Sequence, residues 1–230
     1  MAREINIGDI FSSNNYGDFE IISESNERKY RAKTYNIKFL LTGTEKQSVT
    51  RTDILRGEVK DVYYPSICGI ACIGNVIQKN HKKEYSCWKH MIHRCYNPND
   101  NNYKYYGEKG VIVEKSWLCF ENYLNDIKNL KGYDEEQFQN GQIKLDKDKN
   151  SNEFKIYSKN TCEWISQQEN LRISINKKYG ELIAISPKGI IYEYNHIIDC
   201  AKENNLSSDC IAKCLANKQK SHKGWKFKRK

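Results

Sequence analysis

Apolar and polar side chains alternate along much of the first third of the chain. Residues 19–24 (FEIISE) and 30–41 (YRAKTYNIKFLL) show the two-residue period of half-buried strands, and residues 42–45 (TGTE) carry a turn signal. Gly57 follows a short ILR run and can close a helical turn. We therefore predict a β-rich region over residues 1–80, in which no catalytic motif is visible.

The apolar pattern changes to a helical spacing after residue 81. Spacings of three and four predict a short helix over residues 87–95, which Asn97 and Pro98 end. Residues 103–113 (YKYYGEKGVIV) predict a glycine-punctuated turn that leads into a strand. A second amphipathic helix is indicated by four apolar side chains on one helical face: Phe120, Tyr123, Leu124 and Ile127.

The next segment predicts a strand, a loop, a second strand and a helix in turn. Residues 143–150 (IKLDKDKN) have the pattern of a strand entering a polar loop, and residues 161–166 (TCEWIS) that of a short strand. Ser166 and Glu169 have the spacing of a capping box, so a helix is expected to begin at about Gln167.

Residues 177–230 predict a further small unit. Two strands, 182–186 and 190–194, flank a Pro-Lys-Gly turn and form a hairpin. Asn195 and Ser207 can each cap a short helix, and the close spacing of the two helices is that of a helix-turn-helix. The tail SHKGWKFKRK alternates aromatic residues with lysines, which is typical of an edge strand. The order of elements predicts an α+β protein.

The basic charge is concentrated in one part of the chain. The 230 residues hold 38 Lys and Arg against 29 Asp and Glu, a net charge of +9, and residues 177–230 hold 12 basic against 5 acidic side chains. Basic proteins commonly bind nucleic acid, an anionic membrane surface or acidic proteins. No apolar run reaches the ~18–20 residues of a membrane helix, and the N-terminus lacks an apolar signal core, so we expect a cytoplasmic protein.

The cysteines do not follow a disulfide or zinc-finger pattern. Their number is odd and no CxxC pair occurs, which disfavours a disulfide framework. Most are expected to be small buried apolar residues, because cysteines outside disulfides commonly are. A structural zinc site is the alternative, with four cysteines as its candidate ligands: Cys68, Cys72, Cys87 and Cys95.

Two segments resemble the HNH nucleases of phage and intron homing endonucleases. The central LDKDKN…YSKNTCEWISQQENL resembles their nuclease core, and CWKHMIHRCYNP…YYGEKGVIVEKSWLCFENY resembles the region before that core in phage members. The segment ISPKGIIYEY…SHKGWKFKRK resembles the modular DNA-binding domain that often follows. The opening third, with FLLTGTEK and ILRGEVKD, is less specifically similar to the N-terminal region of some phage HNH-type proteins.

The resemblance implies a fold and a domain organisation. Residues 1–80 would be the β-rich region, residues 81–176 an HNH-like nuclease domain with a ββα-metal core, and residues 177–230 a modular helix-turn-helix DNA-binding domain. Asp146 matches the metal ligand on the first strand of that core, and Asn170 matches the asparagine on its helix. A carboxylate and an amide oxygen suit a single hard divalent cation, Mg²⁺ or Mn²⁺.

The chain departs from the family at the general base. Lys147 stands where the family has histidine, and lysines are normally protonated at neutral pH, so they are poor bases. Lys147 would either act with a lowered pKa or hold the phosphate charge. The asparagine that orients the histidine corresponds to Thr161, with Asn160 one residue early. Asp148 shares a strand face with Asp146 and is a candidate extra ligand.

Each of these residues also has an ordinary interpretation. Asp146 and Asp148 can be loop acids that accept backbone amides, and Asn170 can be a solvated helix residue. His90 and His93, three residues apart on the first predicted helix, are the alternative bases, although one is expected to pack and the other to face solvent.

The C-terminal module supplies the DNA-binding candidates. Ser207 and Ser208 open its second helix, where amides and hydroxyls can bind phosphate. Six phosphate contacts would give a log–log salt slope of about −5. The phosphate contacts are expected from six lysines: Lys213, Lys218, Lys220, Lys223, Lys226 and Lys228.

Three functional hypotheses follow. The first is a phage-type HNH-like homing endonuclease that binds double-stranded DNA and hydrolyses a phosphodiester bond with one divalent metal, in the bacterial cytoplasm. The second is a DNA-binding or regulatory protein with an inactive nuclease core. The third is a protein-interaction factor that acts against a host system.

Overall fold

The computed structural model describes residues 4–29, 31–147 and 155–230. The chain divides into two compact units, residues 1–130 with 147–162 and residues 131–146 with 163–230, which are described separately. Helices and strands are mixed in both units, which confirms the α+β class. No helix in the described ranges is long and apolar enough to cross a membrane. The domain boundaries expected near residues 80 and 176 stay predictions.

The first unit begins with a four-stranded antiparallel sheet in the order β1-β2-β3-β4. Its strands are β1 (Ile10–Ser13), β2 (Gly17–Lys29), β3 (Ala32–Phe39) and β4 (Glu45–Thr50). The helix α1 (Arg51–Arg56) follows directly and ends at Gly57, whose φ of 66° is the left-handed conformation that glycine adopts readily. The predicted strands, turn and helix end are therefore confirmed here, except at residue 30, which lies outside the described residues.

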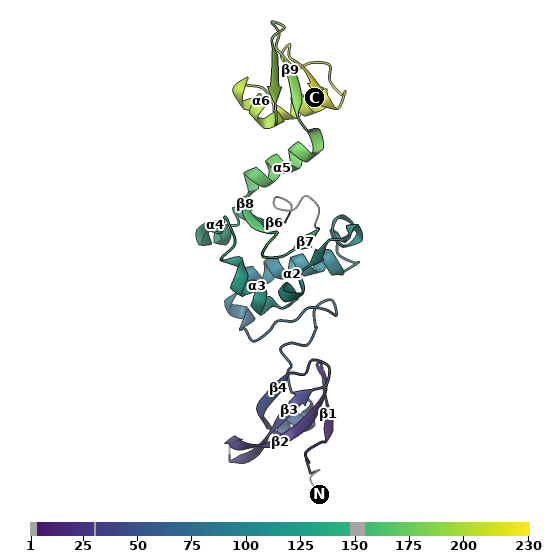
Figure 1. Cartoon of the computed structure of the whole chain (residues 1–230), viewed down its shortest axis with the longest axis vertical. Helices are drawn as coiled ribbons and strands as arrows, with labels where there is room; N and C mark the ends of the chain where they lie inside the picture. Colours follow the sequence, from purple (N-terminus) through teal and green to yellow (C-terminus); the bar gives the residue numbers. More distant parts are fainter. Residues whose placement is uncertain (1–3, 30, 148–154) are drawn as a thin grey trace. The chain divides into compact units, whose positions relative to one another are not determined.

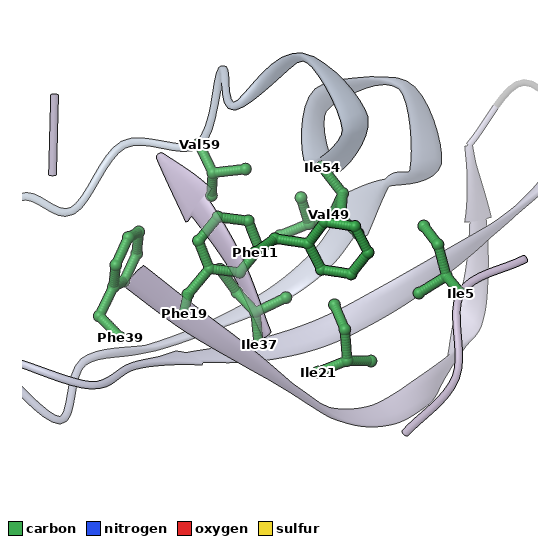
Figure 2. Packing of buried hydrophobic residues seen from close by; sticks show 9 residues of the cluster. All are labelled: Ile5, Phe11, Phe19, Ile21, Ile37, Phe39, Val49, Ile54 and Val59. Atoms are coloured by element: carbon green, nitrogen blue, oxygen red, sulfur yellow. The ribbon is translucent and has the colours of Figure 1, made fainter. Parts of the chain in front are cut away.

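One face of this sheet holds an apolar core (Figure 2). Alternate residues of β2 and β3 point into it, and four of them, Phe19, Ile21, Ile37 and Phe39, are fully buried. The Cα register pairs Phe19 with Phe39 and Ile21 with Ile37, so the cross-strand neighbours cover one another. The alternating pattern of the sequence is thus the direct cause of this sheet.

The rest of the first unit is built mainly from helices around aromatic residues. Its α-helices are α2 (Lys82–Tyr96) and α3 (Phe120–Ile127). Its 3₁₀ helices are η1 (Gln78–Asn80), η2 (Tyr103–Tyr105), η3 (Gly107–Lys109) and η4 (Lys115–Leu118). Trp88, Trp117, Phe120 and Tyr123 are fully buried, and the Trp88 indole N–H donates to the Trp117 carbonyl at 2.7 Å. Strand β5 (Ile112–Val113) pairs in parallel with β7 (Ile156–Tyr157), a long-range pairing that the sequence pattern did not predict.

The second unit begins with a helix that the sequence analysis missed, α4 (Glu135–Asn140). Asp134 caps it by accepting the Gln137 amide at 2.8 Å. The predicted central elements follow as β6 (Ile143–Asp146), β8 (Glu163–Ser166) and α5 (Gln167–Tyr179). β6 and β8 pair antiparallel, and α5 continues directly from β8 (Figure 1).

The C-terminal part of the second unit is a three-stranded antiparallel sheet with two helices. The sheet order is β10-β9-β11, from β9 (Leu182–Ile185), β10 (Ile191–Tyr194) and β11 (Lys226–Arg229). The helices α6 (Ile197–Glu203) and α7 (Ser208–Leu215) are packed together. The hairpin, the helix pair and the edge strand are confirmed, while the N-cap position of the first helix is His196 rather than Asn195, and the His196 side chain makes no capping hydrogen bond.

Candidate functional site

The pairing of β6 with β8 places two acidic residues side by side. The register aligns Asp146 with Glu163 at the ends of the two strands. Trp164 follows Glu163 on β8, and its ring packs against the rings of Tyr133 and Phe138. Gly132 is required beside it, because its φ is +79° and a Cβ there would lie 2.2 Å from the Trp164 carbonyl oxygen.

Asp146 has an unsatisfied carboxylate oxygen. Its Oδ2 is buried and has no hydrogen-bond partner among the described residues, although buried polar atoms are normally paired. Glu163 is 2% exposed and lies 3.5 Å from the ammonium of Lys131. Asp146 Oδ2 is thus an oxygen to which a cation could bind. Within the described residues no three His, Cys, Asp or Glu side chains gather as a metal site, and this holds for the four candidate zinc cysteines.

Asn170 lies in the first half of α5 and is exposed. The start of this helix is set by Ser166, whose hydroxyl accepts the Glu169 amide at 3.1 Å, which confirms the predicted cap. α5 packs against both β6 and β8, so the helix with Asn170 and the strand with Asp146 belong to one strand–strand–helix arrangement.

The other predicted core residues lie in the first unit. Lys147 is 8% exposed, and its ammonium faces the rings of Tyr106 and Tyr157. Asn160 is exposed. Thr161 donates its hydroxyl to the Ile156 carbonyl at 2.7 Å, which makes it part of a local turn. The candidate extra ligand Asp148 lies outside the described residues.

The two histidines weighed as bases lie on α2 in the first unit. His90 is exposed, and the Nδ1 of His93 is 3.3 Å from the Asn97 side-chain amide at the end of the helix. His93 is thus engaged in ending its own helix. α2 also carries Arg94, which sequence analysis did not single out and which lies against the same two tyrosines as Lys147.

The six predicted DNA-binding lysines are all exposed. Phe227 on β11 and Trp225 just before it pack on the core of the module, while Lys226 and Lys228 point to the other face of the strand. Lys223 is already engaged, because its ammonium donates to the Asn205 carbonyl at 2.9 Å. The side chains of the other five lysines form no hydrogen bond or ion pair with the described residues.

The two serines at the start of α7 have different surroundings. The Ser207 hydroxyl accepts the Cys210 amide at 3.4 Å, and the Ser207 amide donates to His222 Nε2 at 3.3 Å. Ser207 therefore serves as a helix cap that also ties the tail to the helix. Ser208 is half-buried at the first position of α7.

A basic hollow lies on the surface of the module beside α7. Four cationic side chains line it together with the carboxylate of Asp209. They come from the end of α5, from α7 and the turn after it, and from β11. Lys213 and Lys218 were predicted from the sequence, whereas two further cations are added by the fold: Lys178 and Arg229.

Two cysteines form a polarised pair in the first unit. The backbones of Cys72 and Cys119 pair through an isolated parallel β-bridge. A hydrogen bond from the Cys72 thiol, with help from the amides of Asn122 and Glu121, lowers the pKa of Cys119 to about 6. The same interaction raises the pKa of Cys72. The hydrogen bond from Cys72 thus favours the thiolate form of Cys119.

Comparison with known proteins places the clearest similarity in the C-terminal module. Residues 183–228 match the family model of the NUMOD-like domain of I-HmuI-like DNA endonucleases. A solved structure from work on DNA binding and cleavage by the HNH homing endonuclease I-HmuI is 24% identical, with a TM-score of 0.24. That match covers 44% of this chain and 62% of the other, so it spans less than two thirds of that endonuclease. No curated protein matches. Over residues 183–228 the chain therefore resembles the I-HmuI-like DNA endonucleases that carry a NUMOD-like domain.

Proposed function

We propose that this protein is an HNH-like endonuclease that binds double-stranded DNA and hydrolyses one of its phosphodiester bonds with a single divalent metal. The observation that carries the proposal is the buried, unpartnered Oδ2 of Asp146 at the end of β6. The similarity of residues 183–228 to a domain of DNA endonucleases supports DNA as the substrate.

Asp146 and Asn170 are the residues proposed to hold the metal. A carboxylate and an amide oxygen fit Mg²⁺ or Mn²⁺, which accept few protein ligands and keep several waters. When bound there, the ion would stabilise the charge that develops on the phosphate and on the leaving oxygen. The chain's own part is to fix the two ligands, through the β6–β8 ladder for Asp146 and through the capped start of α5 for Asn170.

The C-terminal module is proposed to hold the DNA. Its exposed lysines on β11 and the four cations of the hollow beside α7 present one sign of charge, with Asp209 as the exception. Such a surface neutralises phosphates without reading sequence.

A second candidate is a DNA-binding or regulatory protein whose core no longer cuts. The observation in its favour is Lys147, because an ammonium group in the position of the family's histidine cannot accept the proton of the attacking water. Both candidates bind DNA, so cleavage separates them.

The test is nicking of supercoiled plasmid with Mg²⁺ or Mn²⁺. We expect the wild-type chain to convert supercoiled to open-circular plasmid, and Asp146→Ala to abolish the conversion while still binding DNA in EDTA. Glu136→Gln, which changes an exposed acid in the first turn of α4, is the matched control and should cut normally. Nicking that survives Asp146→Ala would overturn the metal site, and binding without any nicking would favour the second candidate.

A further inference from the structure

Two cations share one pair of stacked tyrosine rings in the first unit. The rings of Tyr106 and Tyr157 lie with centroids 6.5 Å apart and an interplanar angle of 28°. The guanidinium carbon of Arg94 is 4.6 Å from the centroid of Tyr106 and 4.7 Å from that of Tyr157. The ammonium of Lys147 is 5.9 Å and 5.8 Å from the same centroids. All four distances are within cation–π range.

The four side chains come from separate parts of the chain. Arg94 stands in the last turn of α2, Tyr106 lies between η2 and η3, and Tyr157 ends β7. Lys147 follows Asp146 directly in the sequence. The parallel pairing of β5 with β7 is what brings Tyr157 to this place.

Arg94 keeps its hydrogen-bond donors unused. Within the described residues no carboxylate or carbonyl accepts from it, and its buried Nε has no partner. Contacts with the ring faces stabilise the cation but leave its N–H groups, of which a guanidinium has five, able to donate hydrogen bonds. A half-buried guanidinium with these N–H groups available can donate hydrogen bonds to an anion that has several oxygens.

Within the described residues, the side chains around Arg94 do not supply that anion. Burial raises the pKa of the Tyr157 phenol, and burial raises the pKa of Cys95 to about 11. Both groups are therefore neutral at pH 7. Two like charges near one ring pair repel each other, so an anion that contacts both would be held more tightly than by either alone.

We propose that Arg94 and Lys147 together bind one phosphate of the DNA backbone. This inference rests on DNA as the substrate in the proposed function and adds a contact in the first unit, outside the C-terminal module. Arg94 supplies the planar fork that matches two phosphate oxygens, and Lys147 supplies a point charge from a nearly buried position. It also gives Lys147 a role that requires its charge rather than a free electron pair.

The test measures DNA affinity of the full chain in EDTA against salt concentration. Each lost phosphate contact should lower the slope of log K against log [NaCl] by about 0.9. We expect this decrease for the double variant Arg94→Gln/Lys147→Met, and a decrease no larger than this for either single variant, because both cations hold the same phosphate. Lys104→Gln is the matched control, since Lys104 lies over the exposed ring of Tyr105, and it should keep the wild-type slope.

A duplex scanned with single neutral methylphosphonates then locates the phosphate. The wild-type chain should lose affinity at one position at which Arg94→Gln loses none. Arg94→Lys keeps the charge and the ring contact, so it should restore most of the slope if Arg94→Gln folds poorly.

Each other outcome contradicts the inference in a different way. Unchanged slopes in variants that melt like the wild-type chain would make the cluster purely structural and leave the proposed function intact. Thermal stabilisation by inorganic phosphate that Arg94→Gln abolishes, without a change in DNA slope, would assign the cluster to a free anion. A wild-type chain that does not bind DNA would overturn both proposals.

Discussion

Arg172 on α5 and Asp199 on α6 form an ion pair, with Nη2 and Oδ2 2.7 Å apart. The pair joins the helix that carries Asn170 to the C-terminal sheet-and-helix module. Two further residues of α5, Ile175 and Tyr179, pack on the apolar core of that module. One helix therefore belongs both to the strand–strand–helix arrangement and to the part that resembles a DNA-binding domain.

The ion pair should contribute modestly to stability. Its side chains are 39% and 35% exposed, so solvent screens the charges, and a double-mutant cycle of Arg172→Met with Asp199→Asn should give a coupling of about 0.2–1 kcal/mol. Urea unfolding at low and high salt measures it. A coupling that does not fall with added salt would show that the contact acts through packing.

Asn170 should matter for cutting and not for holding DNA. Replacing it by alanine removes a proposed metal ligand, so nicking should fall by at least about 10–100-fold, the range found for residues that only support ligands. Asn170→Asp keeps an oxygen and should retain part of the activity.

The control for this prediction is Gln168→Ala, two residues earlier on α5 and also exposed. Gln168→Ala should nick like the wild-type chain. Equal rates for Asn170→Ala and Gln168→Ala would remove Asn170 from the site, whatever the outcome for Asp146.

The outer face of β11 should contribute to DNA affinity. Replacing Lys226 and Lys228 together by glutamine should lower the salt slope of binding by about 1.8, because two phosphate contacts are lost. Lys230→Gln should change it little, since Lys230 is paired with Glu193 at 2.8 Å and with Glu181 at 3.5 Å. Fluorescence anisotropy with a short duplex measures both, and equal slopes for the two variants would place the DNA elsewhere.

Cys119 should be the most reactive cysteine near neutral pH. Its pKa of about 6 means that the thiolate is lost only as the pH falls through 6, so alkylation by iodoacetamide should rise to half its plateau there. Cys68, whose pKa burial raises, should react appreciably only in alkaline solution. Peptide mapping by mass spectrometry follows both sites.

Removing the Cys72 thiol tests the cause of this reactivity. The Cys72→Ala variant loses the hydrogen bond that most favours the thiolate, so its alkylation midpoint at Cys119 should move upward toward 9. An unchanged midpoint would assign the effect to the backbone amides at the start of α3.

The N-terminal sheet should depend strongly on its inner face. Ile37 is fully buried in the apolar cluster that also holds Phe19, Ile21 and Val49, so Ile37→Ala should cost about 2–5 kcal/mol in the free energy of unfolding (Figure 2). Leu41→Ala, at a side chain that is 66% exposed, should change it by less than about 0.5 kcal/mol. Similar losses for both would mean that the sheet is not stabilised by this core.

Elements with a local cause were predictable from the sequence. The alternation in 19–24 placed β2, the serine at 166 placed the start of α5, and the serine at 207 placed the start of α7. Each of these elements depends on interactions between residues that are close in the sequence, so the local sequence pattern is enough to predict it. The short α4 was not predicted because it has a single buried apolar residue, Phe138, and one residue cannot show a helical repeat.

Features that join distant residues could not be predicted from local patterns. The parallel pairing of β5 with β7 joins residues 112 and 156, and the cluster on Tyr106 and Tyr157 draws its cations from positions 94 and 147. Thr161, matched to a catalytic position by resemblance, turned out to hold a turn through the Ile156 carbonyl. Local periodicity records which side chains are buried or cap a helix. Only the folded chain brings a guanidinium, an ammonium and two rings together, because that contact requires strand pairing across more than forty residues.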